Sequence, residues 1–205
     1  LYRAFVYAVS DGAWGVQLVF DNKVILGTRA RKTRTRSFNA FSSIDYPETA
    51  MFRDRRLIQF LQRPAEYTHA VFNTALDPNV FVLRLVPGMR ADIIPMLEGR
   101  YRALVLESFG VGGLPGGDDG AMFAAVRDWC GAGHLAVFTT QVPHEGSDLA
   151  VYEVGRAAKA LPGVLEAHDM TPEATAVKLM WVLGQTTDRA EAEKLFLTPV
   201  QWDIL

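Results

Sequence analysis

Continuous apolar runs alternate with amphipathic segments through the second half of the chain. The apolar runs predict buried strands at residues 80–86, 103–106 and 135–138. The segments between and after them predict helices at residues 93–97, 121–129 and 152–160, and again from Thr171 onwards. Apolar strands separated by helices are typical of a parallel sheet that is covered on both faces. We therefore predict an α/β fold whose C-terminal part is doubly wound around a mainly parallel sheet.

The first 79 residues follow a different pattern. Residues 1–9 predict the last turns of a helix, and residues 15–20 and 24–26 predict the two strands of a β-hairpin. Residues 46–79 contain three prolines, many charges and weak periodicity. These features indicate a long connection that contains one short strand at residues 57–60.

Composition narrows the class of protein. Apolar residues make up 49% of the chain and charged residues 21%, which excludes extended disorder, and a net charge of −2 argues against a general nucleic-acid binder. The single cysteine, Cys130, lies in an apolar stretch, so we expect a buried, inert thiol and a reducing, cytoplasmic setting. No apolar run reaches the ~20 residues that span a bilayer. Because the chain opens inside a predicted helix without an initiator Met, we interpret it as a fragment.

In a parallel sheet, ligands bind beyond the carboxyl ends of the strands. The loops of interest are therefore residues 87–91, 108–117 and 139–148. The glycines Gly110, Gly112 and Gly113 follow a predicted strand as a phosphate cradle does, but the full motif is absent and a tight turn fits them better.

The four histidines do not indicate a specific site. They show no metal-binding spacing, so the sequence predicts no metal site. His144 and Glu145 share a loop at a predicted strand end. They fit either an acid/base pair or, more simply, a solvated pair.

A basic run is the most unusual feature of the sequence. Its five members lie within eight positions: Arg29, Arg31, Lys32, Arg34 and Arg36. It could be a solvated cationic loop, or it could bind nucleic acid, although no aromatic residue is interleaved before Phe38. In an extended segment Lys32, Arg34 and Arg36 would share one face. A lysine that is crowded by arginines and partly buried would also suit a base or proton shuttle, because its charged form is disfavoured. Residue types alone leave these three interpretations open.

A family resemblance begins at this basic run. Residues 27–43, GTRARKTRTRSFNAFSS, resemble the lysine segment of bacterial asparaginases, in which a strand leads through a Lys-Thr or Lys-Ala pair to a Phe-x-Ala-Phe-x-Ser stretch. The likeness continues in order through Pro87-Gly88, ESFGVGG at 107–113, Thr140-Gln141, DMTPEA at 169–174 and Lys178-Leu179. It covers essentially the whole chain and is nearest the cytoplasmic-type members.

The resemblance implies two domains and one catalytic residue in this chain. Residues 1–45 would be the end of the N-terminal catalytic domain, residues 46–79 a linker and residues 80–205 the C-terminal domain. Position by position, Lys32 matches the lysine of the family's Thr-Lys-Asp arrangement. The family's nucleophilic Thr-Gly-Gly-Thr and its Gly-Thr-Asp-Thr motif do not occur in these residues. We therefore expect the isolated chain to be inactive.

The resemblance also implies the chemistry and the partners. A threonine attacks the side-chain amide of L-asparagine, an acyl-enzyme releases ammonia, and hydrolysis gives aspartate, with no metal or organic cofactor. Family members form homo-oligomers, dimers or tetramers, in which the second domain of one subunit completes its neighbour's site. Gly110, Gly112, Gly113 and Tyr152 match the places from which that contribution comes.

Two departures from the family pattern affect regulation. Some cytoplasmic members bind an effector with an arginine and a cysteine at positions where this chain has Glu107 and Val142. An acid in place of an arginine removes a bidentate partner for a carboxylate, so we do not expect that type of control.

Two further hypotheses stay open beside an asparaginase. One is the asparaginase-like subunit of an amidotransferase that acts on Glu-tRNA, which shares the lysine segment but would need a tRNA-binding part. The other is a non-catalytic assembly domain. We expect partners in neither nucleic acid nor membrane.

Overall fold

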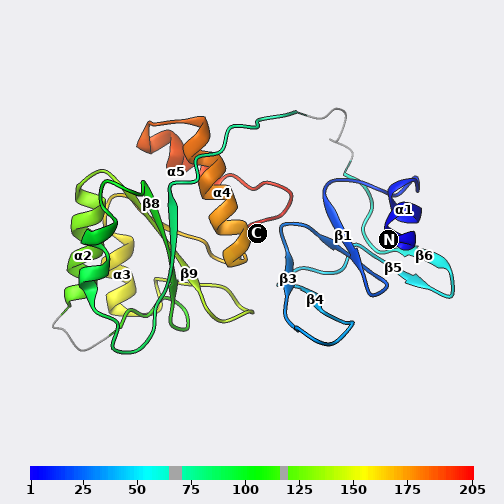
Figure 1. Cartoon of the computed structure of the whole chain (residues 1–205), viewed down its shortest axis with the longest axis horizontal. Helices are drawn as coiled ribbons and strands as arrows, with labels where there is room; N and C mark the ends of the chain where they lie inside the picture. The colour runs from blue at the N-terminus through cyan, green and yellow to red at the C-terminus, as the bar shows by residue number, and fades with distance from the viewer. Residues whose placement is uncertain (65–70, 116–119) are drawn as a thin grey trace. The chain divides into compact units, whose positions relative to one another are not determined.

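The computed structural model describes residues 1–64, 71–115 and 120–205 (Figure 1). The chain divides into two compact units. The first unit comprises Leu1–Asn73 with Gln201–Asp203, and the second comprises Thr74–Val200 with Ile204–Leu205. Within the described ranges, no helix combines the length and the apolar character needed to cross a bilayer.

The second unit is built on a four-stranded parallel sheet. Its strands are β7 (Val80–Arg84), β8 (Ala103–Ser108), β9 (Leu135–Thr140) and β10 (Val164–Glu166). They lie in the order β10-β9-β8-β7, and every neighbouring pair is parallel. The predicted parallel α/β sheet is confirmed, with β10 as a strand that the sequence pattern did not identify. The order runs through the sheet without reversal.

Helices cover both faces of this sheet (Figure 1). One face packs against α4 (Pro172–Gln185) and α5 (Arg189–Leu197). The other packs against α2 (Ala121–Gly131), α3 (Glu153–Lys159) and the short helical turns. Successive side chains of a strand point to opposite faces, so Leu104 and Leu106 enter one core while Val105 enters the other. This double burial explains why the strands read as unbroken apolar runs.

The helix predicted over residues 93–97 is wrong. Two 3₁₀ turns lie there instead, η1 (Ala91–Ile93) and η2 (Pro95–Leu97). Pro95 has no N–H to donate and its ring obstructs the preceding turn, so an α-helix cannot run through it. Ile94 and Leu97 are nevertheless buried in the core, as their apolar character suggested.

Two local predictions in the second unit are confirmed. The Thr171 side chain caps α4 by accepting a hydrogen bond from the Ala174 N–H at 3.1 Å, with Pro172 at the first helical position. Cys130 is buried on α2. Burial raises the pKa of its thiol to about 11, although the charge of Arg189 and a backbone hydrogen bond act in the opposite direction. The thiol is therefore protonated at neutral pH.

The first unit contains helix α1 (Tyr2–Ala8) and two small antiparallel sheets. The larger sheet has the order β1-β2-β5-β6, and the smaller pairs β3 with β4. The strand bounds are β1 (Gln17–Phe20), β2 (Lys23–Leu26), β3 (Ala30–Lys32), β4 (Phe41–Ser43), β5 (Ala50–Arg53) and β6 (Arg56–Gln59). The hairpin of β1 and β2 is confirmed.

A second hairpin lies where the sequence pattern indicated a connection with one short strand. β5 and β6 join at Asp54 and Arg55, whose φ angles of 49° and 67° are left-handed. Such turns usually carry Asn-Gly or Asp-Gly, so this pair of charged residues gave no turn signal.

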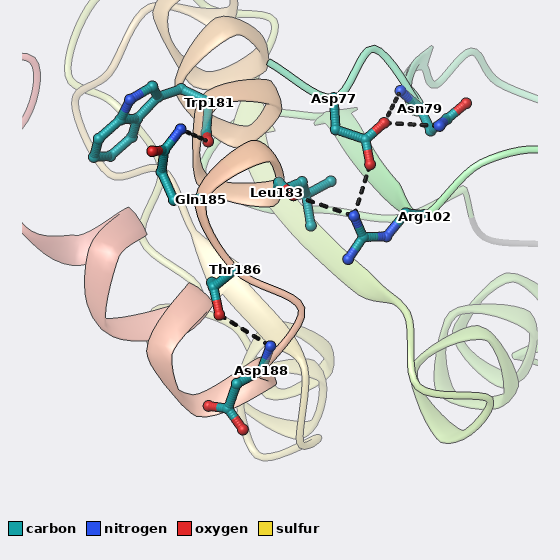
Figure 2. A network of polar contacts seen from close by, with 8 residues as sticks. All are labelled: Asp77, Asn79, Arg102, Trp181, Leu183, Gln185, Thr186 and Asp188. Atoms are coloured by element: carbon teal, nitrogen blue, oxygen red, sulfur yellow. Dashed lines mark hydrogen bonds and ion pairs between the residues drawn. The ribbon is translucent and has the colours of Figure 1, made fainter. Parts of the chain in front are cut away.

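A polar network holds residues 75–79 against α4 and the start of β8 (Figure 2). Arg102 Nη1 donates to Asp77 Oδ2 at 2.7 Å and to the Leu183 carbonyl at 3.2 Å. The backbone and side-chain nitrogens of Asn79 both donate to Asp77 Oδ1. Burial would raise the pKa of Asp77, but the hydrogen bonds from Asn79 and Arg102 and the charge of Arg102 outweigh it and lower that pKa.

Replacing Asp77 should therefore destabilise the protein in a pH-dependent manner. Asp77→Asn leaves one acceptor oxygen where Asp77 uses both, so the bond from Arg102 or the bonds from Asn79 are lost. The variant should lower the free energy of unfolding by about 2 kcal/mol at pH 7. A carboxyl whose pKa is depressed by folding contributes stability above its unfolded pKa and loses it as the pH falls through the folded pKa. The difference between the variant and the wild type should therefore shrink in that acidic range, as measured by urea unfolding from pH 7 to pH 2.

The exposed ion pair between Arg127 and Asp128 supplies the control. Asp128→Asn should change the free energy of unfolding by less than ~0.5 kcal/mol at every pH, because exposed pairs contribute little. A cost for Asp77→Asn that is equal at pH 2 and pH 7 would show that its charge is not what stabilises the network.

Candidate functional site

Lys32 lies at the end of β3, opposite Phe41 of β4. Beyond this pair, the Thr33 N–H donates to the Ala40 carbonyl at 2.8 Å, and the Thr33 and Ser42 hydroxyl oxygens are 2.8 Å apart. The hairpin thus presents Lys32 at the start of its connecting loop. The side chain is exposed. The partial burial on which a shuttle role was argued from the sequence is not present in this structure.

The basic run does not form one surface. Arg29 is fully buried, Arg31 is half-buried, and Arg34 and Arg36 are exposed. The extended backbone ends at Lys32, because residues 35–38 form bends. The condition under which Lys32, Arg34 and Arg36 would share one face, an extended segment, is therefore not met. The five basic residues therefore lie in different environments, from the protein interior at Arg29 to the solvent-exposed surface at Arg36.

Aromatic contacts fix the loop that follows Lys32. The rings of Phe38 and Phe41 lie 5.2 Å and 5.3 Å from that of Phe20 on β1, measured between centroids. These separations lie in the range at which aromatic pairs stabilise each other. The Phe-x-Ala-Phe spacing thus ties the end of the loop and the first residue of β4 to β1.

The glycine residues after β8 form a tight turn. The Gly113 N–H donates to the Phe109 carbonyl at 2.7 Å, and the Phe109 N–H donates to the Gly113 carbonyl at 3.0 Å. Gly110 and Gly112 have φ angles of +51° and +146°, which favour glycine. The predicted tight turn is confirmed, and it lies at the carboxyl end of β8. Residues 116 and 117 of the predicted loop lie outside the described residues.

This turn and the start of α3 line one cavity of about 410 Å³. Its lining residues are Gly112, Gly113, Leu114, Tyr152, Glu153, Val154 and Gly155. The structure thus brings together three of the four residues that the sequence marked in this domain. Gly110 lies in the same turn but not in the lining. The Tyr152 side chain is 61% exposed, so its ring is accessible to a ligand or to another subunit.

Leu149 joins the two sides of the cavity. A Cβ on Gly112 would lie 2.5 Å from Leu149 Cδ2, and a Cβ on Gly155 would lie 2.4 Å from the Leu149 carbonyl oxygen. The Asp148 N–H donates to the Val111 carbonyl at 2.8 Å. The turn after β8, the loop after β9 and the start of α3 therefore pack closely around Leu149.

The sequence pattern did not identify Glu166, which holds the Leu149 backbone in place. Its carboxylate is buried at the end of β10, where it accepts hydrogen bonds from the Leu149 N–H at 2.7 Å and from Lys159 Nζ at 2.9 Å. The bond to Glu166 raises the pKa of Lys159 despite some burial. An acid at the end of an unbroken apolar strand would have been a signal, but β10 has only three residues and was not recognised.

The remaining sequence candidates lie apart from the cavity lining. His144 and Glu145 are exposed in the loop after β9. Glu107 pairs with Arg84 on the adjacent strand at 3.5 Å, and Val142 is 45% exposed. In the parts of the chain that the structure describes, no three side chains of the metal-binding types gather into a possible ion site.

Two family models match the chain along most of its length. One is described as "Asparaginase, N-terminal" and matches residues 1–66. The other is described as "Glutaminase/Asparaginase C-terminal domain" and matches residues 79–196. The second match alone extends over more than half of the 205 residues.

Relatives of two kinds resemble the sequence. The L-asparaginase of Thermococcus kodakarensis is 38% identical over 182 residues, which are 88% of this chain and 54% of that protein. A glutamyl-tRNA(Gln) amidotransferase subunit of Metallosphaera sedula is 33% identical over 178 residues, which are 84% of this chain and 39% of that protein. The chain thus spans about half the length of the first relative and less of the second.

Solved structures agree with the sequence matches. The thermostable L-asparaginase from Thermococcus kodakarensis superposes with a TM-score of 0.91 at 34% identity, over 100% of this chain and 61% of that one. L-asparaginase I from Vibrio cholerae gives 0.81 at 25% identity, over 93% and 57%. On the evidence of these matches and of the two family models, the chain belongs to the glutaminase/asparaginase family.

Proposed function

We propose that this chain is part of an L-asparaginase that hydrolyses the side-chain amide of asparagine to aspartate and ammonia. The observation that carries the proposal is the position of Lys32. It is exposed at the end of β3, on a hairpin that aromatic contacts hold in place, within the segment that resembles the asparaginase lysine motif. The asparaginase relative from Thermococcus kodakarensis is also more similar in sequence than the amidotransferase relative from Metallosphaera sedula.

The proposed mechanism assigns Lys32 to proton transfer. A threonine would attack the amide carbon and form an acyl-enzyme, from which ammonia leaves before water releases aspartate. That threonine belongs to family motifs that these residues do not contain. Lys32 would help to deprotonate the attacking group and stabilise the charge that develops on it. Such a role needs a less hydrated ammonium than the exposed one seen here, and bound substrate or the remaining protein would have to supply that environment.

The proposal extends to the second unit. We place the cavity of Gly112, Gly113 and Tyr152 at the site of a neighbouring subunit in a homo-oligomer, with Gly110 shaping the turn. Support comes from its position at the carboxyl end of the sheet, where parallel α/β folds bind ligands. The exposed Tyr152 ring is suited to such a contact. We also propose a cytoplasmic setting, in keeping with the single buried cysteine.

The second candidate function is that of an amidotransferase component. The observation in its favour is 33% identity over 84% of the chain with the glutamyl-tRNA(Gln) amidotransferase relative. The two candidates share the same amide chemistry. They differ in the fate of the ammonia, because an amidotransferase would couple amide hydrolysis to an acceptor that is bound to tRNA.

The isolated 205 residues should be inactive. Because the threonine motifs are absent from the sequence, purified protein of this length should release no ammonia from asparagine above the uncatalysed background. A coupled glutamate dehydrogenase assay measures this. Turnover that persists after repurification, and that disappears in the Lys32→Ala variant, would show that these residues contain a complete site.

Removing Lys32 should disable the complete protein. Lys32→Ala should lower kcat at least ~10²-fold, the usual scale for the loss of a positioned acid/base group. The melting temperature should change little, because the side chain is exposed. Lys32→Arg should not restore turnover, since a guanidinium stays protonated.

Arg34→Ala is the matched control for this prediction. Arg34 is an exposed cation two positions further along the same loop, and it donates to the Asn39 carbonyl at 3.2 Å. This variant should keep normal turnover. If the two alanine variants behave alike and both remain active, the catalytic assignment of Lys32 is wrong.

A further inference from the structure

The C-terminal residues Gln201–Asp203 return to the first unit and bind the segment that leads into β3. The Thr28 hydroxyl donates to the Gln201 carbonyl at 2.9 Å, and Arg29 Nε donates to the Trp202 carbonyl. On the other side, the Val16 N–H donates to Gln201 Oε1 at 3.1 Å. We call Gln201–Asp203 the C-terminal strap.

Aromatic rings hold the strap in place. The Trp202 ring lies edge-on to that of Trp14, with centroids 5.3 Å apart, and 6.4 Å from that of Tyr46. The Arg29 guanidinium lies 5.6 Å from the centroid of the same Tyr46 ring. Burial raises the pKa of Tyr46, partly offset by the charge of Arg29. Trp202 thus supports both the strap and the surroundings of the buried arginine.

The backbone of the strap is strained. Gln201 and Trp202 have φ angles of 49° and 55°, in the left-handed region that costs a residue with a side chain roughly 1–2 kcal/mol. Such conformations persist where surrounding contacts over-determine them, often at functional sites. Gly15 permits the close approach, because a Cβ there would lie 2.8 Å from Gln201 Oε1. The contacts with Thr28, Arg29 and Trp14 therefore offset the free-energy cost of this left-handed backbone.

The buried arginine connects the strap with Lys32. The Ile44 N–H donates to the Arg29 carbonyl at 3.0 Å, so Arg29 extends the ladder of β3 and β4 by one step. That sheet has two strands of three residues each, and so small a ladder is weak by itself. Side chains alternate along a strand, which places Arg29 and Lys32 on opposite sides. A slip of one residue would exchange the two sides and turn Lys32 inward.

We propose that the C-terminal strap positions Lys32 for catalysis by anchoring Arg29, with Trp202 and Arg29 acting as positioning residues. The inference rests on the proposed function, because it concerns the orientation of the proposed catalytic lysine. The strap fixes the register and direction of β3 where the two-stranded ladder cannot.

The test uses the complete protein and the variant Trp202→Ala. Removing the ring frees the Trp202 carbonyl from its position beside Arg29, so kcat should fall at least ~10-fold while KM changes less than ~3-fold, because misplacement of a reacting group acts on the transition state. Trp202→Phe keeps an aromatic ring and should recover most of kcat. Hydrogen exchange of the amides at residues 29–33 should become faster in the alanine variant only.

A double-mutant cycle separates positioning from general stability. In a Lys32→Ala background, Trp202→Ala should lower kcat no further, because the group through which it acts is absent. Phe52→Leu, at a buried position of β5, is the control: it should lower the melting temperature but leave kcat unchanged where the protein is folded.

The outcomes distinguish this inference from the proposed function. If Lys32→Ala lowers kcat at least ~10²-fold but Trp202→Ala keeps normal kcat, or lowers the kcat of the wild type and the residual kcat of Lys32→Ala by the same factor, the strap does not position Lys32 while the proposed function stands. If Lys32→Ala itself keeps normal turnover of asparagine, the catalytic role of Lys32 fails, and the positioning role of the strap fails with it. If the complete wild-type protein releases no ammonia from asparagine, the proposed function itself fails.

Discussion

A guanidinium that is removed from water loses its hydration, at a cost of several kcal/mol unless the surrounding groups replace it. Arg29 is such a group, with no exposed surface. Its Nε donates to the Trp202 carbonyl and its face lies near Tyr46. These contacts hold the Arg29 side chain, and with it the chain on either side. β2 ends three residues before Arg29, and β3 begins one residue after it.

The second unit depends on a different kind of constraint, which is close packing of backbone. Gly112 and Gly155 both lie against Leu149, and the buried carboxylate of Glu166 accepts a hydrogen bond from the Leu149 N–H. A side chain at Gly155 would push α3 away from the Leu149 carbonyl, and one at Gly112 would displace the end of the Leu149 side chain. The cavity beside Tyr152 is therefore shaped by a turn and a helix that both pack against Leu149.

The sequence predicted those features that are local or periodic. The strands β7, β8 and β9 were evident because their side chains are buried on both faces, and the cap at Thr171 because its spacing is specific. β10 has three residues and β5 is followed by an Asp-Arg turn, so neither gave a pattern long enough to recognise. The predicted helix over residues 93–97 is absent because Pro95 interrupts it, although the apolar spacing there suits a helix.

In the candidate site too, some residues could be predicted from the sequence and others could not. Lys32, Gly112, Gly113 and Tyr152 were found through a family resemblance, whereas Arg29 and Glu166 were not distinguished from ordinary charged residues. Their roles arise from contacts with residues far away in sequence, such as the 173 positions that separate Arg29 from Trp202. Burial of a charge depends on the finished fold, and no local pattern encodes it.

Both units belong, in the function proposed above, to one amide hydrolase whose substrate is free asparagine. The asparaginase and amidotransferase relatives share enough sequence that family membership does not separate them. The most direct measurement is the initial rate of ammonia release by the complete protein from free L-asparagine, with and without glutamyl-tRNA. We predict saturable turnover that tRNA does not change. Ammonia release that requires the tRNA and a second protein would contradict the proposed function.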